Sequence, residues 1–202
     1  MRLLSIALLT IIFTGLAAAA QAEIGEIVAQ CESCHGPGGV SAHDDVPTIA
    51  GQNASFIEKA MRTYQAWGRP CIKSGYRHGD TTRAKTDMCQ IAEGLTGEDI
   101  QALSAHFTSL PFRAAVQPFD AGLAARGAAL HQEHCELCHE QGGTVADRGP
   151  RLAGQWQTYL RKSLKFVPTG EHLVPPAMES VIIDLGEQDI DALMHYYASQ
   201  QE

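Results

Sequence analysis

The sequence is poor in the features that mark several large classes of protein. Its 15 Lys and Arg residues against 23 Asp and Glu residues give a formal net charge of −8, which argues against binding to nucleic acid phosphates. After the first 22 residues, no run is long and apolar enough to cross a bilayer. No Ser/His/Asp set, phosphate-binding loop or carboxylate pair indicates hydrolysis or phosphoryl transfer. We therefore expect no catalytic residue of these kinds, no nucleic acid partner and no membrane span in the mature chain.

The first 22 residues resemble an export signal. An arginine follows Met1, apolar residues fill positions 3–16, and small residues end in Ala20-Gln21-Ala22. This order is typical of a secretory signal with an Ala-x-Ala cleavage site, and the apolar run is shorter than a membrane span. We predict a signal peptide at residues 1–22, cleavage after Ala22 and export to the periplasm. An uncleaved anchor is the alternative.

A Cys-x-x-Cys-His run occurs twice. The copies are Cys31, Cys34 and His35, and Cys135, Cys138 and His139. Two thiols at this spacing can both add to the vinyl groups on one edge of a porphyrin, and the adjacent imidazole then reaches the iron. A single Cys-x-x-Cys also occurs in zinc sites and thioredoxin-like redox pairs, but the histidine and the second copy favour haem. We predict two covalently bound haem c groups, with His35 on the first iron and His139 on the second.

The two halves of the chain match well beyond these motifs. Residues 47–52 (Pro-Thr-Ile-Ala-Gly-Gln) match residues 150–155 (Pro-Arg-Leu-Ala-Gly-Gln), and residues 95–103 match residues 185–193. Such self-similarity indicates one unit present in two copies. Apolar residues at helical spacing precede each motif and recur in each closing segment. The pattern therefore predicts an all-α fold of two tandem cytochrome c-type domains, each wrapped around one haem.

The predicted domains are small. We place the first at residues 23–110 and the second at residues 121–202, joined by a proline-containing linker at residues 111–120. Units of this size bury little surface on their own. A porphyrin would contribute on the order of 10 kcal/mol of gross stabilisation, because burying apolar surface is worth about 25 cal/mol per Å². An aromatic content of only 6% is consistent with a core that the porphyrin partly fills.

Two prolines follow the motifs at matched positions. We expect the carbonyls of Pro47 and Pro150 to accept a hydrogen bond from the ligand histidine, which would fix the tautomer of the ring.

Residues 96–99 have the form of a capping box at the start of the closing helix of the first unit. Each closing helix is expected to pack on the helix that carries the cysteines.

The methionines supply the candidates for the sixth iron ligand. Methionine is the usual partner of histidine on such an iron, and its thioether favours Fe(II). Met88 and Met178 coincide in the repeat, whereas Met61 and Met194 have no methionine counterpart and are expected to fill space. We predict Met88 on the first haem iron and Met178 on the second.

The first unit carries an insertion near residues 69–83 that the second unit lacks. Cys71 and Cys89 are the only cysteines outside the motifs, and we predict a disulfide between them that pins this longer loop. The alternative is that one of them ligates iron or exchanges with a partner's thiols. His78 is a competing candidate for an axial ligand. A basic cluster in this region is expected to be solvated; it consists of Arg77, His78, Arg83 and Lys85.

These paired motifs resemble those of the dihaem cytochromes c4. The second half is similar in more detail, at residues 119–131, 152–156 and 192–201, to the dihaem cytochrome subunit of flavocytochrome c sulfide dehydrogenase. That resemblance implies a separate FAD-containing subunit that oxidises sulfide in the periplasm and passes electrons singly to the two haems. It also implies a soluble redox acceptor for those electrons. The insertion with Cys71 and Cys89 is not part of the family pattern.

Three functions follow from these features. The first is the electron-accepting subunit of a sulfide-oxidising flavocytochrome c, which is not a catalyst by itself. The second is a free-standing shuttle of the cytochrome c4 type that delivers electrons to a terminal oxidase. The third is a dihaem redox enzyme, which would need an open or unusual iron ligand. The negative net charge favours a partner with a basic patch in each case.

Overall fold

The computed structural model describes residues 24–201, and the predicted signal peptide lies outside them. Within this range every regular element is helical, and the one pairing of β type is an isolated bridge between Ser74 and Thr86. Residues 24–35 lie in a helix that carries the first motif. The other elements are η1 (Pro37–Gly39), α2 (Ala54–Gln65), α3 (Met88–Glu93), α4 (Gly97–Ser109), α5 (Ala121–His134), α6 (Glu140–Gly143), α7 (Gln157–Lys165), α8 (Pro176–Asp184) and α9 (Glu187–Ser199). The predicted all-α fold is confirmed for these residues.

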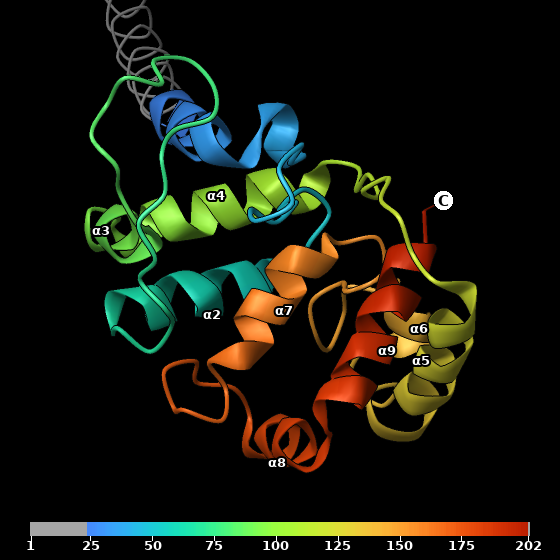
Figure 1. Cartoon of the computed structure of the whole chain (residues 1–202). Coiled ribbons are helices and arrows are strands. Elements are labelled where there is room, and N and C mark those ends of the chain that lie inside the picture. The colour runs from blue at the N-terminus through green and yellow to red at the C-terminus, as the bar shows by residue number, and fades with distance from the viewer. Residues whose placement is uncertain (1–23, 202) are drawn as a thin grey trace, which may run out of the picture.

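The helices gather into two groups. Figure 1 shows the helix at residues 24–35 with α2, α3 and α4 on one side, and α5, α6, α8 and α9 on the other. Helix α7 belongs to the second group, because Leu160 on α7 is in one buried cluster with Leu193 on α9. Residues 111–120 contain no helix and run from α4 to α5 along the edge of the molecule (Figure 1).

The closing helix of the first half packs on the helix that carries the cysteines, as predicted. Leu103 and Phe107 of α4 are buried, and Ile27 and Cys31 pack against them. The start of α4 is the predicted capping box, in which the side chain of Thr96 accepts from the Asp99 N–H at 3.1 Å and the Asp99 carboxylate accepts from the Thr96 N–H at 2.8 Å. This closes two free donors at the helix start.

The second half has the same pairing. Helix α9 lies along α5, and Leu193, Met194 and Tyr197 form its buried face. The two backbones meet at Gly127, where a Cβ atom would lie 2.1 Å from the Ala192 carbonyl oxygen. Only glycine allows this approach, so the residue fixes how deeply α5 sits against α9.

The repeat extends to the backbone hydrogen bonds of the loops after each motif. Gly39 and Gly143 both have positive φ, at 71° and 82°, a conformation that favours glycine. The Gly39 carbonyl accepts two N–H groups of residues 47–52 at 2.8 and 3.2 Å, and the Gly143 carbonyl accepts two of residues 150–155 at 2.9 and 3.0 Å. In each half, therefore, the loop holds the proline segment beside the motif histidine.

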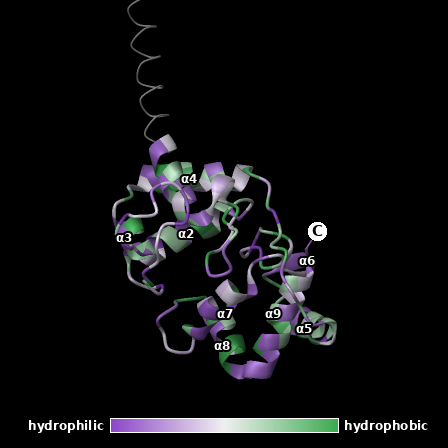
Figure 2. Cartoon of the chain, turned by 45° about the horizontal axis from the view of Figure 1, so that its top comes forward, coloured by the Kyte–Doolittle hydropathy of each residue, from purple (hydrophilic) through white to green (hydrophobic). Residues whose placement is uncertain are grey.

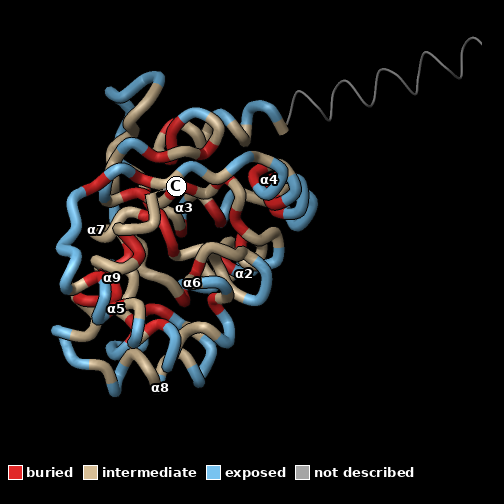
Figure 3. Tube along the Cα trace, turned by 90° about the vertical axis from the view of Figure 1, so that its right-hand side faces the viewer, coloured by how far each residue is buried: buried red, intermediate tan, exposed pale blue. Residues whose placement is uncertain are grey.

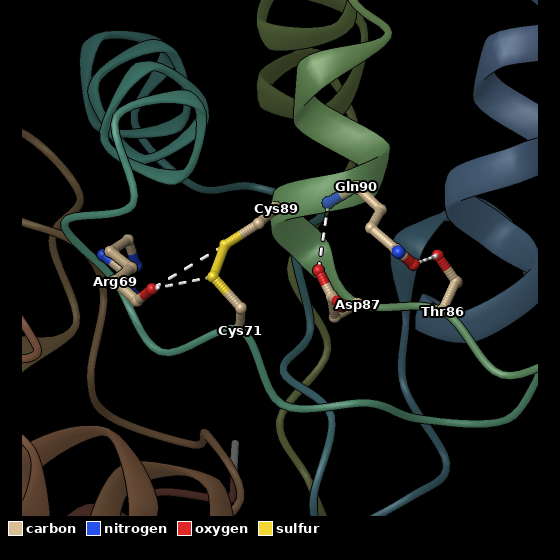
Figure 4. Close-up of a disulfide and its surroundings, with 6 residues drawn as sticks. All are labelled: Arg69, Cys71, Thr86, Asp87, Cys89 and Gln90. Carbon is tan, nitrogen blue, oxygen red and sulfur yellow. Dashed lines mark hydrogen bonds between the residues drawn. A yellow bond between two sulfur atoms is a disulfide. The ribbon is translucent and has the colours of Figure 1, made fainter.

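The insertion of the first half is closed by a disulfide. Cys71 and Cys89 are joined, with their Cα atoms 5.5 Å apart (Figure 4). Cys89 lies in the first turn of α3, where the Asp87 side chain accepts from the Gln90 N–H at 3.0 Å. The same loop is pinned a second time by the Ser74–Thr86 bridge. The disulfide and the bridge together attach the insertion to the start of α3.

Replacing Gly127 by alanine should lower the free energy of unfolding by about 2 kcal/mol, because the added methyl group forces α5 away from α9. The result would oppose helix propensity, which favours alanine over glycine by about 1 kcal/mol. Gly25→Ala is the matched control, since a Cβ there meets nothing within 4 Å. Urea unfolding of the haem-loaded protein measures both variants, and equal stability of Gly127→Ala and wild type would contradict the close approach.

Candidate functional site

The first motif lies at the C-terminal end of the helix at residues 24–35. The His35 side chain is buried, and its Nδ1 donates to the Pro47 carbonyl at 2.8 Å. Burial lowers the pKa of His35, and the bond to the Pro47 carbonyl opposes this only in part. The ring is therefore neutral with its proton on Nδ1, and Nε2 keeps the lone pair that a metal needs. The expected role of Pro47 is confirmed.

The second motif repeats this arrangement after α5. His139 is equally buried, and its Nδ1 donates to the Pro150 carbonyl at 3.0 Å. Burial lowers the pKa of His139, the Pro150 carbonyl opposes it, and the charge of His131 adds to the lowering. Gly149 allows the loop to pack flat on the ring, because a Cβ at this position would lie 2.8 Å from His139 Cε1.

Three of the four motif cysteines are half-buried, and Cys138 is exposed. Burial raises the pKa of Cys31 to about 12, with the charges of Cys34 and Glu32 adding to the effect. Burial also raises the pKa of Cys34 and of Cys135. Before haem is attached, these three thiols are therefore held as neutral groups, whereas redox pairs and zinc sites use thiolates. The raised pKa values argue against those two uses of the motifs.

No zinc-type ligand set forms at either motif. Among residues 24–201, the one group of Cys, His, Asp and Glu close enough to hold a metal ion is Cys71, Asp87 and Cys89. The two sulfur atoms of that group are already joined in the disulfide. Each motif histidine thus has no further side-chain ligand of the kind a structural zinc ion requires.

The four methionines of the described part of the chain divide into two pairs. Met194 is on the buried face of α9, and Met61 packs against the cluster of the first half, so both fill space as predicted. Met88 is the first residue of α3, and Met178 lies in the first turn of α8. Both are half-buried and belong to neither cluster. Met88 and Met178 therefore remain the candidates for the sixth ligand.

Helix α8 carries apolar side chains that the protein does not cover. Val181 and Ile182 are only half-buried, Ile183 is 56% exposed, and no residue of α8 is buried. Apolar residues appear on α8 in Figure 2, and its trace shows no buried segment in Figure 3. A porphyrin is a large apolar group, and its burial against such a face would be favourable. These side chains are on the same helix as Met178, so a haem held by Cys135, Cys138 and His139 and bound by Met178 would have apolar surface to pack against.

Arg83 and Lys85 are exposed, as expected of a solvated face, but the other two members of the basic cluster of the insertion are not. The backbone N–H groups of Arg77 and His78 both donate to the Ser33 carbonyl, at 2.8 and 3.0 Å, so this segment lies against the first motif. Arg77 Nη2 also binds Asp45 at 2.9 Å. Arg77 Nε and His78 Nε2 are buried and find no hydrogen-bond partner in the described structure. Buried nitrogen atoms without partners are costly, and they suit a cofactor that carries carboxylates, as haem does.

Two buried glutamines have contacts that the sequence did not predict. Gln52 and Gln155 are 3% and 2% exposed, and each binds backbone of the opposite half. Both glutamines end a matched segment of the repeat, residues 47–52 and 150–155, so the sequence shows that they are equivalent. It does not show which residue each one binds, because that residue lies about a hundred positions away in the chain.

Comparisons with known proteins agree with this geometry. Residues 122–196 match the family model described as cytochrome C oxidase, cbb3-type, subunit III. A cytochrome c4 of Azotobacter vinelandii is 31% identical, over 94% of this chain and 94% of that protein. The crystal structure of reduced cytochrome c4 from Pseudomonas stutzeri superposes with a TM-score of 0.69 at 28% identity, and covers 90% of this chain and 98% of that one.

A more distant relative carries a functional name. A thiosulfate dehydrogenase electron acceptor of Stutzerimonas stutzeri is 27% identical over 84% of this chain and 78% of that protein. In the described part of this chain, no helix is long and apolar enough to cross a membrane. The whole-length similarity, the repeated motifs and the two tandem helical units lead to one assignment. The chain belongs to the cytochrome c4 family of electron-transfer proteins, which have two cytochrome c domains and two covalently bound haem c groups.

Proposed function

We propose that His35 and Met88 bind the first haem iron, that His139 and Met178 bind the second, and that the chain relays single electrons through them. The thioether attachments would be Cys31 and Cys34 in one half and Cys135 and Cys138 in the other. The observation that carries this proposal is the matched pair of bonds from His35 to the Pro47 carbonyl and from His139 to the Pro150 carbonyl. A haem bound in this way supplies one Fe(III)/Fe(II) couple.

The protein groups around each iron would favour electron transfer over catalysis. Each imidazole has its Nδ1 proton fixed by a carbonyl, which leaves Nε2 free and makes the ring a stronger donor. Met88 and Met178 would each supply a thioether to one iron, so no ligand position would be left for a substrate. A thioether ligand favours the reduced iron and raises its potential. This ligand set supports a carrier rather than a dihaem enzyme.

The domain limits and the location of the protein belong to the same proposal. We infer one haem-binding domain at residues 23–110 and another at 121–202, with residues 111–120 as the linker. The absence of helix from residues 111–120 supports these limits. Export to the periplasm after removal of residues 1–22 would bring the thiols to the compartment in which bacterial c-type haem is attached.

The electron donor is proposed to be the FAD-containing subunit of a sulfide dehydrogenase. The support is the resemblance of residues 119–131, 152–156 and 192–201 to the cytochrome subunit of flavocytochrome c. A second candidate is a free-standing carrier. It is favoured by similarity to cytochromes c4 over 94% of the chain, and by the relative that accepts electrons from thiosulfate dehydrogenase.

The ligand assignment predicts a spectroscopic change. Met88→Ala and Met178→Ala should each remove about half of the long-wavelength charge-transfer band of methionine-ligated ferric haem, because each leaves one iron without its thioether. Met61→Ala, a methionine that packs against the first core, is the control and should leave the band unchanged. If neither Met88→Ala nor Met178→Ala alters the spectrum, the proposed ligands are wrong.

The proposed donor predicts a stable complex. Chain purified from its native cells should carry a flavin-bearing polypeptide in equal amount, and sulfide should then reduce both haems. The isolated chain is the control and should not be reduced by sulfide at that rate. A monomer that copurifies with no flavoprotein would contradict the sulfide dehydrogenase partner and favour the free-standing carrier. Reduction of the haems by thiosulfate in the presence of a thiosulfate dehydrogenase would identify that enzyme as the donor instead.

A further inference from the structure

We infer that each half of the protein sets the reduction potential of the haem iron in the other half, through a crossed pair of glutamine side chains. Gln155 of the second half acts on His35, and Gln52 of the first half acts on His139. Neither glutamine touches a histidine, so both are positioning residues that act through one peptide group. The inference rests on the proposed role of the two histidines as iron ligands.

The first crossing joins Gln155 to Thr48. Gln155 Oε1 accepts from the Thr48 N–H at 3.1 Å, and Gln155 Nε2 donates to the Thr48 carbonyl at 2.6 Å. The Thr48 N–H belongs to the same planar peptide group as the Pro47 carbonyl. That carbonyl accepts from His35 Nδ1 at 2.8 Å. One peptide group of the first half is thus bound at its oxygen by the histidine and at its nitrogen by the second half.

The second crossing has the same connections in the opposite direction. Gln52 Oε1 accepts from the Arg151 N–H at 2.9 Å, and Gln52 Nε2 donates to the Arg151 carbonyl at 3.2 Å. The Arg151 N–H shares its peptide group with the Pro150 carbonyl, which accepts from His139 Nδ1 at 3.0 Å. The same relay therefore occurs twice, with the halves exchanged.

The orientation of each amide is fixed by its two bonds. One backbone N–H and one backbone carbonyl face each glutamine, so only one placement of Oε1 and Nε2 satisfies both. Gln155 is held further, because its own carbonyl accepts from Gln117 Nε2 at 2.7 Å. Gln52 is held at its carbonyl by the Thr108 hydroxyl at 2.8 Å. Both side chains are therefore rigid parts of the contact between the halves.

Such a bond can reach the iron through polarisation. A hydrogen bond to the N–H of a peptide makes its carbonyl oxygen more negative, and chains of hydrogen bonds strengthen one another by about 10–30% per bond. A stronger acceptor at Nδ1 draws the proton away from the ring and makes Nε2 a better donor to the metal. This favours Fe(III) over Fe(II), so each glutamine lowers the potential of the opposite haem. One electron enters the iron on reduction, and Nδ1 keeps its proton throughout.

The two relays should differ in strength. Thr48 is 2% exposed, whereas Arg151 is half-buried. Water can replace a lost partner at the Arg151 N–H more readily than at the Thr48 N–H, so loss of Gln155 should have the larger effect. The same connections make the potentials depend on contact between the halves, because separation would remove both bonds at once.

The test uses Gln155→Leu and Gln52→Leu in the haem-loaded protein, with each iron's potential measured separately by following its haem methyl signals in a redox titration. Gln155→Leu should raise the reduction potential of the haem bound by His35, and its Fe(II)/Fe(III) ratio at a fixed solution potential should rise about two- to fivefold. The potential of the haem bound by His139 should not change. Gln52→Leu should raise the reduction potential of the haem bound by His139, by a smaller amount. Gln65→Leu is the matched control, since it removes a half-buried amide that binds only the Ala92 and Leu95 carbonyls and touches neither peptide nor either glutamine.

A change in the potential of only the opposite haem supports the relay. A change in the potential of the haem in the glutamine's own half, an equal change in both haems, or no change contradicts it.

Gln155→Glu and Gln52→Glu keep the side-chain volume, and they extend the test if a leucine variant does not load haem. The neutral acid should restore the wild-type potential, and ionisation should lower the potential of the opposite haem. No response to ionisation would contradict the relay. These potentials need no donor protein, and the methionine variants test ligation separately, so failure of the relay is distinct from failure of the proposed function.

Discussion

The hydrogen bond from each motif histidine to a proline carbonyl is the constraint on which the rest of the structure depends. It leaves Nε2 as the free donor of His35 and of His139, and it fixes the direction of both rings. The carbonyls of the positive-φ glycines Gly39 and Gly143 bind the proline segments and keep them beside the histidines. The same peptide groups then bind the glutamines of the opposite half. The histidines, loops and contact between halves are therefore one connected system.

The cofactor explains why two such small cores suffice. The buried cluster of the first half centres on Ile57, Leu103 and Phe107, and that of the second on four residues of α7 and α9. Helix α8 has no buried residue although it carries a run of apolar side chains. A haem in each half would cover apolar surface that the protein leaves open, so the stability of the chain and its redox chemistry have the same source.

The sequence predicted whatever depends on local spacing or on the repeat. The helices before each motif, the Thr96 capping box and the disulfide between Cys71 and Cys89 all follow from neighbours in the chain or from pairs of unique residues. Arg77 and His78 of the basic cluster lie against the first motif instead of in solvent, which the sequence did not predict because the backbone bonds of their segment to Ser33 are long-range. The crossed glutamines were missed for the same reason. A repeat reveals that two residues are equivalent, but not that each one acts on the other copy.

Similarity to cytochromes c4 over nearly the whole chain and the motif geometry agree on a protein that carries two covalent haems. The first half also carries an insertion, pinned by the disulfide between Cys71 and Cys89, that the second half lacks. The central claim is one haem per repeat unit, and mass spectrometry of the purified, denatured protein tests it most directly. The account predicts a polypeptide beginning at Glu23 with two covalently attached haem groups, one on each Cys-x-x-Cys-His peptide after digestion. A denatured chain that retains one haem or none would contradict it.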